Sequence, residues 1–292
     1  IMNKLALGTV QFGMEYGITN NSGQFSSTEI KEVLRLAKVN GINTLDTAIL
    51  YGDSEKKLGK QNLDKFNIVT KIPKISESVN IDKLILEYIK TSLERLNVQD
   101  IYGVLLHNPD DINTSYGDAI YESLLILKEM GLVKKIGVSI HSPEELKNIY
   151  SNFFFDIIQS PFNIFDTRLR DSGWMTKLSK KGVEIHTRST FLQGLLLQDK
   201  YKLPKKFLKW ERLFSAWETF VNNNKITKME ACLQFAKSFK EIDKVLVGID
   251  NVKQFKEILS YNFSKNFKDF QDFQDFSCSD EMLINPSNWE LL

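Results

Sequence analysis

The most constraining feature of this sequence is an alternation of short β-type runs with longer helical patterns, which continues almost to its end. Several runs are nearly continuous stretches of apolar residues, typical of strands buried on both faces of a parallel sheet. Parallel strands joined by helices need right-handed crossover connections. We expect eight strands, at residues 5–9, 44–47, 67–71, 101–107, 134–139, 157–162, 183–188 and 244–249.

Between these runs, apolar residues recur at the spacing of amphipathic helices. The first such segment has an apolar stripe from Ile30 to Ala37, and Ser26 and Glu29 form a capping-box signature at its start. A short helix is expected at 54–61. Longer helices are expected near residues 85–96, 116–130, 143–150, 171–181, 208–224, 227–239 and 252–260.

Eight strands alternating with helices over 292 residues fit an α/β fold, a single (β/α)8 TIM barrel that takes up residues 1–292 as one domain. A doubly wound open sheet is the alternative, and it is disfavoured because no strand-to-helix turn carries a Gly-x-Gly-x-x-Gly fingerprint. Residues 261–292 are expected to form a C-terminal tail that packs on the barrel. Within it, Phe263, Phe267 and Phe270 have helical spacing, so a partner-binding stripe is the other interpretation.

Charge and cysteine usage restrict the classes of partner. The formal net charge is +1 without an evident basic stripe, so we expect no nucleic-acid partner. No apolar run reaches the length of about 18 residues that spans a membrane, and the first residues lack a signal-peptide layout, so a cytoplasmic monomer or small homo-oligomer is expected. Two cysteines, Cys232 and Cys278, form no disulfide framework, and without a Cys/His cluster no metal site is expected.

Polar residues follow three consecutive predicted strands. In a barrel of this kind the carboxyl ends of the strands share one mouth, where active sites form. Asp46 ends the second strand with Tyr51 in its loop, Lys71 ends the third strand, and His107 ends the fourth. Each residue alone is explained by capping or packing. Four of them on one rim are not, because a buried Lys or His costs free energy unless it is paired.

These four residue types are suited to donating a proton to a carbonyl oxygen. A Lys ammonium beside a phenol favours the phenolate, which makes Tyr51 a better proton donor. Asp46 would hold Lys71 charged and oriented, and His107 would supply a second hydrogen bond to the developing oxyanion. None of the four is a reductant, so a reduction at this site requires a hydride cofactor.

The segments "LDTAILYGDSEKKLGK", "IVTKI", "IYGVLLHNPDD", "KKIGVS", "IIQSPFNIFD" and "STFLQGLL" resemble successive motifs of the aldo-keto reductases. The resemblance runs from about Leu5 to Leu259 and implies a (β/α)8 barrel that binds NADP(H), with NAD(H) as the alternative, without a Rossmann motif. It also implies a catalytic tetrad made up of Asp46, Tyr51, Lys71 and His107. Tyr51 would then be the general acid in the reduction of an aldehyde or ketone to an alcohol, or in the reverse oxidation.

The same resemblance also implies which residues of this chain bind the cofactor. Ser139 and Gln159 match positions that hold the nicotinamide carboxamide, whereas Ile140 replaces a frequent Asn. Arg188 matches a position whose side chain, often aromatic, stacks on the nicotinamide ring. The segment that covers the pyrophosphate is matched by Ser189, Phe191, Gln193, Gly194 and Leu195.

An adenosine-binding segment is matched near the end of the chain by Gly248, Gln254 and Glu257, with Ile258 in place of the usual Asn. Lys253 is the one basic residue close to the expected position of a 2′-phosphate. The expectation of NADP(H) therefore rests on the resemblance and not on these residues.

Other polar residues receive plainer interpretations. We expect His141 at an ordinary loop position, with a place at the mouth as the alternative, and His186 as a core histidine with satisfied hydrogen bonds. Trp174 is expected outside the substrate pocket. The basic loop of residues 200–206 is expected to be solvated, and attraction of a phosphorylated substrate or of cofactor phosphates is the alternative.

Two further functions remain open beside the reduction of a small-molecule carbonyl compound. A barrel lyase would use Lys71 as a Schiff-base nucleophile. A regulatory or sensor protein would bind the cofactor with little turnover. The identity of the carbonyl substrate depends on loops whose conformation the sequence does not specify.

Overall fold

The computed structural model describes residues 4–17, 23–75, 80–261 and 275–292. Eight parallel strands close into a barrel in chain order, with β1 paired to both β2 and β8. The strands are β1 (Leu5–Gly8), β2 (Thr44–Asp46), β3 (Asn67–Ile72), β4 (Ile101–Leu106), β5 (Val133–Ser139), β6 (Ile157–Pro161), β7 (Glu184–Arg188) and β8 (Lys244–Val247). The predicted (β/α)8 barrel is therefore confirmed, and the open sheet is excluded by the pairing of β1 with β8.

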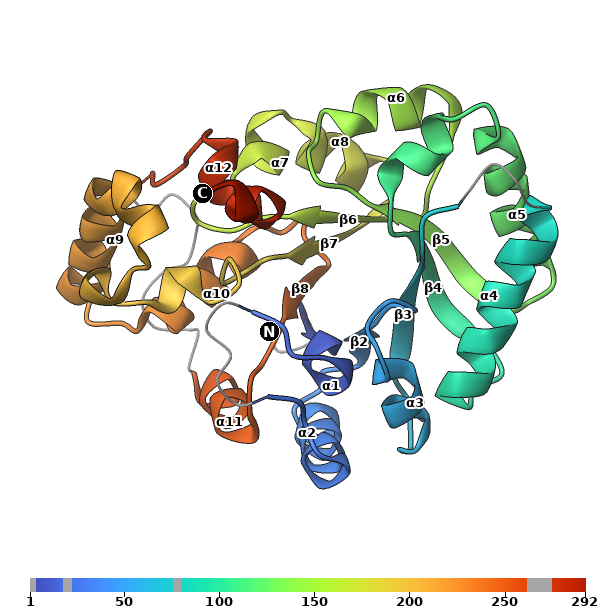
Figure 1. Cartoon of the computed structure of the whole chain (residues 1–292), viewed down its shortest axis with the longest axis horizontal. Helices are drawn as coiled ribbons and strands as arrows, with labels where there is room; N and C mark the ends of the chain where they lie inside the picture. The colour runs from blue at the N-terminus through green and yellow to red at the C-terminus, as the bar shows by residue number, and fades with distance from the viewer. Residues whose placement is uncertain (1–3, 18–22, 76–79, 262–274) are drawn as a thin grey trace.

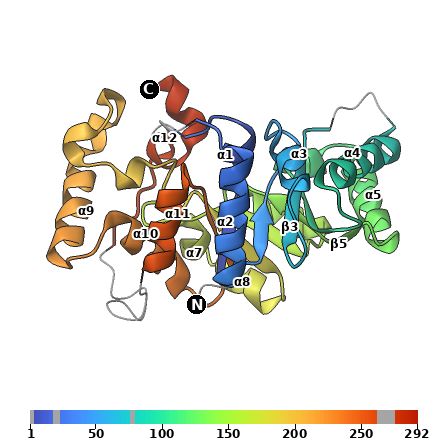
Figure 2. The same ribbon diagram turned by 90° about the horizontal axis from the view of Figure 1, so that it is seen from below.

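Helices surround the barrel and connect consecutive strands (Figure 1). They are α1 (Val10–Gly13), α2 (Ser27–Val39), α3 (Ser54–Gly59), α4 (Ile81–Leu96), α5 (Gly117–Glu129), α6 (Glu145–Asn152), α7 (Arg168–Asp171), α8 (Trp174–Lys180), α9 (Glu211–Asn223), α10 (Lys228–Ser238), α11 (Val252–Ser260) and α12 (Glu281–Ile284). Short 3-10 helices are η2 (Pro109–Asn113), η3 (Leu195–Leu197), η4 (Lys200–Lys202), η5 (Lys205–Trp210) and η7 (Pro286–Leu291). Helices α2 and α11 lie side by side in both views (Figures 1 and 2).

Side-chain caps mark the start of α2, α4, α10, α11 and α12. The capping box is confirmed at α2, where Ser26 Oγ accepts from the Glu29 amide at 3.3 Å and Glu29 Oε2 accepts from the Ser26 amide at 2.9 Å. The helix predicted near 171–181 is present as α8, which begins at Trp174 and is preceded by the short helix α7. Gly173 separates them in the left-handed region, with a φ of 76°, which interrupts helical geometry.

The alternation of side chains along the strands places polar groups at the mouth and apolar groups beneath them. Residues two apart on a strand share one face. Val69 therefore lies below Lys71 on β3, and Leu105 lies on the same face as Lys71, with which it is paired in register on β4. Val69, Leu105 and Ile157 are fully buried and form an apolar cluster separate from the main core. This cluster is the floor beneath the mouth.

Residues 275–292 of the expected C-terminal tail return to the barrel. Trp289 is buried, packs edge-on against Phe207 with ring centroids 4.9 Å apart, and donates its indole N–H to the carbonyl of Leu283 at 3.0 Å. Helix α12 lies at the same end of the barrel as α1 (Figure 2). The residues of the predicted Phe stripe, Phe263, Phe267 and Phe270, lie outside the described residues.

Polar groups gather around Glu184, which begins β7 at the end of the barrel opposite the mouth. Glu184 Oε1 accepts hydrogen bonds from Tyr102 at 2.7 Å and from Lys135 at 2.6 Å, and Oε2 lies 3.3 Å from His186 Nε2. Burial alone would raise the pKa of Glu184, but these hydrogen bonds outweigh it and lower this pKa to about 2. His186 is buried as predicted, but its Nδ1 has no hydrogen-bond partner, so its hydrogen bonds are only partly satisfied.

We predict that Glu184→Gln lowers the free energy of unfolding by about 1–3 kcal/mol at pH 7 and by much less near pH 2. A carboxylate with a depressed folded pKa stabilises the fold above its unfolded pKa of about 4.3, and this contribution is lost as pH falls toward the folded value of about 2. Urea unfolding of both proteins across this pH range measures the difference. Asp100→Asn removes an exposed ion pair with Lys134 and serves as the control, with a loss below about 0.5 kcal/mol. A Glu184→Gln loss that is equal at both pH values contradicts the prediction.

Candidate active site

Asp46 and Lys71 form a buried ion pair at the mouth of the barrel. Lys71 Nζ donates to Asp46 Oδ1 at 2.5 Å and to the carbonyl of Thr47 at 3.0 Å. The Asp46 side chain is 5% exposed and the Lys71 side chain is 1% exposed. Burial alone would lower the pKa of Lys71, but the Asp46 carboxylate and the Tyr51 hydroxyl outweigh it and hold this pKa above its usual value. Lys71 is therefore an ammonium group at neutral pH.

The second oxygen of Asp46 is held from the other side of the barrel. Gln159 Nε2, on β6, donates to Asp46 Oδ2 at 2.7 Å, and Ser139 Oγ, on β5, donates to Gln159 Oε1 at 3.3 Å. Ser139 and Gln159 thus orient Asp46 and, through it, Lys71. Their predicted role at the nicotinamide carboxamide stays a prediction, and both line the cavity described below.

Tyr51 is placed beside Lys71 and His107 by the loop between β2 and α3. Lys71 Nζ lies 5.1 Å from the centroid of the Tyr51 ring, and the His107 ring lies edge-on to it with centroids 5.9 Å apart. The backbone of this loop packs directly on Gly13. A Cβ atom at Gly13 would lie 1.8 Å from the Tyr51 carbonyl oxygen, and one at Gly52 would lie 2.4 Å from the Gly13 oxygen, so the approach requires glycine on both sides.

Buried hydroxyl groups anchor the same loop to the barrel. Ser54, at the start of α3, donates to the carbonyl of Thr9 at 2.9 Å and accepts from Thr47 Oγ1 at 3.1 Å. Glu55 Oε1 accepts from Thr70 Oγ1 at 2.8 Å. These bonds fix α3 against β1, β2 and β3, and so they fix the loop that carries Tyr51.

His107 follows β4 and completes the group of four side chains predicted to meet. Burial first, and then the Lys71 ammonium, lower the pKa of His107 to about 4. Its Nδ1 is buried without a hydrogen-bond partner. The imidazole is therefore neutral at physiological pH, and Nε2 is the ring nitrogen left for a ligand.

A cavity of about 470 Å³ opens over these four residues. Leu195 is fully buried in the core, and Lys253 and Glu257 are exposed on α11, so these three predicted cofactor residues do not line it. The other predicted cofactor residues do line the cavity: Ser139, Gln159, Arg188, Ser189, Phe191, Gln193, Gly194, Gly248 and Gln254.

The loop after β7 has an unusual backbone where it borders the cavity. Ser189, Leu192 and Gln193 have φ values of 61°, 47° and 51°, in the left-handed region that costs free energy for residues other than glycine. Asn163 Nδ2 donates to the Ser189 carbonyl at 3.0 Å and helps to hold this conformation. Such strained positions cluster at ligand sites, which agrees with the predicted role of this loop.

The prediction of an ordinary loop position for His141 is wrong, because His141 lines the cavity. Arg188, at the end of β7, donates to the carbonyl of Ile140 at 3.0 Å and lies 3.3 Å from His141 Nδ1. Burial and the Arg188 charge lower the pKa of His141. Arg188 of β7 thus holds the loop after β5 at the mouth. The two residues of this contact, Arg188 and Ile140, are far apart in the sequence, so the sequence pattern does not predict it.

Trp174 and the lysines of the basic loop lie outside the cavity, as expected. Trp174 packs against Tyr150, with ring centroids 5.8 Å apart, and does not border the cavity. In the basic loop, Lys206 Nζ donates to the carbonyl of Trp289 at 2.7 Å, and no lysine of residues 200–206 lines the cavity.

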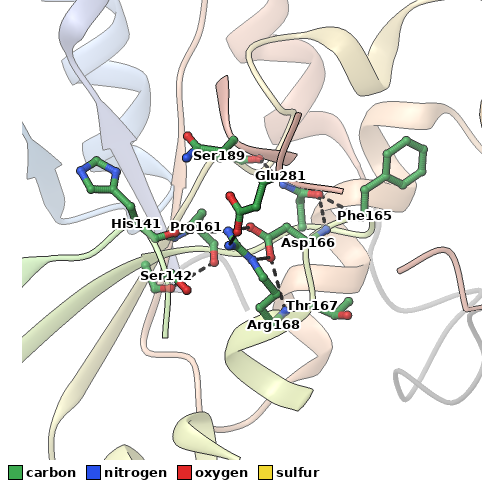
Figure 3. A network of polar contacts seen from close by, with 12 residues as sticks. His141, Ser142, Pro161, Phe165, Asp166, Thr167, Arg168, Ser189 and Glu281 are labelled. Atoms are coloured by element: carbon green, nitrogen blue, oxygen red, sulfur yellow. Dashed lines mark hydrogen bonds and ion pairs between the residues drawn. The ribbon is translucent and has the colours of Figure 1, made fainter. Parts of the chain in front are cut away.

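Arg168 ties the mouth to the C-terminal segment (Figure 3). Its Nε and Nη2 donate to the two carboxylate oxygens of Asp166, both at 2.8 Å, and Nη2 also donates to the carbonyl of His141 at 3.2 Å. Its Nη1 bonds to Glu281 of α12. Asp166 is fully buried, so the guanidinium is fixed where it meets α12. The segment after α12 then contributes Asn285, Pro286 and Ser287 to the cavity wall.

Several cavity residues were not predicted from the sequence. Gln11 and Asp250 follow β1 and β8, and Tyr16 accepts from Gln193 Nε2 at 3.2 Å. Asp46 and Lys71 are identified because they lie at strand ends, whereas Gln11 and Asp250 lie three residues beyond the ends of β1 and β8, so that rule does not select them. No helix among the described residues is long and apolar enough to cross a membrane.

Comparisons with known proteins agree with this geometry. A family model described as the Aldo/keto reductase family matches residues 4–277. An aldo-keto reductase of Gibberella moniliformis is 29% identical over 231 residues, covering 73% of this chain and 68% of that protein. The uncharacterized oxidoreductase YqkF of Bacillus subtilis is 25% identical over 281 residues, covering 88% of this chain and 90% of that protein.

Solved structures share the fold. The holo form of the aldo-keto reductase AKR11C1 from Bacillus halodurans has a TM-score of 0.75 at 20% identity, over 98% of this chain and 95% of that one. The glycerol dehydrogenase AKR11B4 from Gluconobacter oxydans has a TM-score of 0.68 at 22% identity, over 88% and 85%. Because the family model spans nearly the whole sequence, the chain belongs to the aldo/keto reductase family.

Proposed function

We propose that this protein catalyses the reduction of a small-molecule aldehyde or ketone to an alcohol, or the reverse oxidation, with NAD(P)H as hydride donor and Tyr51 as general acid. The observation that carries the proposal is the placement of Tyr51 in a cavity, between the buried Lys71–Asp46 pair and a neutral His107. The family membership and relatives named as oxidoreductases support it. Residues 1–292 would act as one barrel domain, in which Asn285, Pro286 and Ser287 of the tail contribute to the cavity wall.

The cavity fits a nicotinamide dinucleotide. Bare backbone at Gly8 and Gly248 borders it, and a buried acceptor, Gln11 Oε1, has no hydrogen-bond partner among the described residues. The residues predicted to hold the nicotinamide and pyrophosphate line the same space. When bound, the cofactor supplies the hydride that the protein side chains lack. The resemblance favours NADP(H) over NAD(H), but Lys253, expected at the 2′-phosphate, is exposed on α11 and does not line the cavity.

The side chains of the mouth divide the acid–base work. Tyr51 donates its proton to the carbonyl oxygen, and the Lys71 ammonium stabilises the phenolate that remains. Asp46 keeps Lys71 charged and in place. Neutral His107 donates a hydrogen bond from Nε2 to the same oxygen and so stabilises the charge that develops there.

The lyase interpretation is disfavoured by the state of Lys71. A Schiff-base nucleophile must be an unprotonated amine, usually one with a lowered pKa. The pKa of Lys71 is raised instead, and its Nζ is held by Asp46 and by the carbonyl of Thr47.

We predict that Tyr51→Phe lowers kcat by about 10²–10⁴-fold and leaves cofactor binding intact. The substitution removes the proposed proton donor and keeps the ring that packs beside His107. Steady-state rates with a panel of aldehydes, together with fluorescence titration of NADH and NADPH, measure both effects. Tyr121→Phe, which removes a hydroxyl far from the mouth that donates to the Phe154 carbonyl, is the matched control. A Tyr51→Phe enzyme with more than half of the wild-type kcat rules out this role.

We predict that Lys71→Met lowers kcat by more than about 100-fold, and that Asp46→Asn lowers it less. Lys71 stabilises the phenolate directly, whereas Asp46 acts by positioning Lys71. Because Lys71→Met leaves a buried carboxylate unpaired, it also destabilises the fold by about 3–5 kcal/mol. Rates are therefore compared per folded molecule, with the folded fraction taken from circular dichroism. A greater loss in Asp46→Asn than in Lys71→Met reverses the proposed division of roles.

We predict that the charge of His107 does not affect kcat between pH 5 and 8. Its pKa of about 4 keeps the ring neutral over this range, and protonation reduces kcat only as pH falls toward that value. His107→Gln keeps a neutral donor, so it retains part of the activity and loses this acid limb. The measurement is kcat against pH for both enzymes at saturating substrate. A wild-type kcat that rises from pH 7 to pH 5, and does not in His107→Gln, shows that the imidazolium is the active form.

A further inference from the structure

The cavity wall beside β8 presents hydrogen-bond acceptors. Gln11, which follows β1, is only 6% exposed and lines the cavity. Its amide lies over the backbone of Gly248, where a Cβ atom would be 3.0 Å from Gln11 Nε2. Gln11 Oε1 is buried and has no hydrogen-bond partner in the part of the chain that the structure describes. A buried carbonyl oxygen without a donor costs free energy, so this oxygen is available to a hydroxyl or amine of a ligand.

Asp250 lies next to Gln11 on the same wall. It follows β8, is half-buried and lines the cavity. Burial raises the pKa of Asp250, and a hydrogen bond from the Gln11 side chain opposes that shift. The amide nitrogen of Gln11 is its one donor group, so that bond leaves Gln11 Oε1 free beside the carboxylate. The pair therefore offers acceptors from two side chains to whatever occupies this part of the cavity.

The cationic groups that line the cavity are bound to partners away from Gln11 and Asp250. Lys71 is committed to Asp46, and Arg188 is held toward the loop after β5 by the carbonyl of Ile140. Lys253 is exposed on α11 and does not border the cavity. Among the described residues that line it, none near β8 is a lysine or arginine.

We propose that Gln11 and Asp250 accept hydrogen bonds from the hydroxyl groups of the adenosine ribose and make this enzyme selective for NAD(H) over NADP(H). This inference rests on the proposed function, because it requires a nicotinamide cofactor. A ribose 2′-hydroxyl donates to a carboxylate or an amide oxygen. A 2′-phosphate is an anion that brings acceptors instead of a donor, so it meets repulsion from Asp250 and no compensating cation.

The order of the strands around the barrel indicates which end of the cofactor reaches Gln11 and Asp250. Hydride transfer requires the nicotinamide beside Tyr51, over β2 and β3. In the barrel β1 lies between β2 and β8, and the cavity is also lined by Gly248 and Gln254, which follow β8. The part of the dinucleotide farthest from the reacting ring therefore lies against Asp250.

Dissociation constants of NADH and NADPH, measured by calorimetry without any carbonyl substrate, test this proposal. We expect the wild-type protein to bind NADH at least about tenfold more tightly than NADPH. Asp250→Asn keeps the shape and removes the charge, so it should shrink the NADPH-to-NADH ratio by about tenfold, mainly by tightening NADPH. Glu122→Gln removes one negative charge from an exposed site on α5 and should leave the ratio unchanged.

Each result decides the question. A wild-type preference for NADPH, which needs no variant, overturns the inference and leaves the reductase proposal standing. An unchanged ratio in Asp250→Asn, with both cofactors weakened equally, places Asp250 at the other ribose and also overturns it. Binding of neither nucleotide overturns the proposed function itself. If Asp250→Asn does not fold, Gln11→Met replaces it, and NADH binding that is not weakened there contradicts the proposal.

Discussion

The buried ion pair between Lys71 and Asp46 is the interaction on which the mouth of this barrel depends. Removing two charges from water is favourable only when every remaining donor and acceptor is satisfied. Here the Thr47 carbonyl accepts a second hydrogen bond from Lys71, and Gln159 donates to the second oxygen of Asp46. Gln159 belongs to β6, so the pair is complete only when the sheet has closed. The hydrogen bonds that complete the ion pair therefore come from strands on opposite sides of the barrel.

The two ends of the barrel satisfy different physical demands. At the end opposite the mouth, Glu184 is surrounded by three donors that depress its pKa, an arrangement that favours stability. At the mouth, His107 keeps an unpartnered buried nitrogen, and Ser189 and Gln193 have left-handed backbone conformations. Each of these features costs the folded protein free energy. The strain and the unpartnered nitrogen at the mouth agree with the proposed ligand site, whereas Glu184 at the other end accepts three hydrogen bonds.

Charge is distributed unevenly around the cavity. Lys71 and Arg188 lie toward β3 and β7, whereas Asp250 and the free oxygen of Gln11 lie where β8 and β1 meet. The cationic part suits a carbonyl oxygen that becomes negative during reduction. The acceptor-rich part suits hydroxyl donors. Arg168 holds α12, and hence the adjoining wall segment, against this mouth through Glu281 and the carbonyl of His141.

The sequence by itself determined the eight strands, their parallel order and the four polar residues at consecutive strand ends, because the periodicity of a strand records which face is buried and the carboxyl ends of a barrel's strands share one rim. It contained no comparable signal for Gln11 and Asp250, which lie three residues beyond the ends of β1 and β8. Only the tertiary structure decided that these two meet, that Arg188 draws His141 to the mouth, and that Arg168 reaches Glu281, 113 residues away. Contacts between loops of different strands depend on the closed geometry of the barrel, and no local periodicity encodes them.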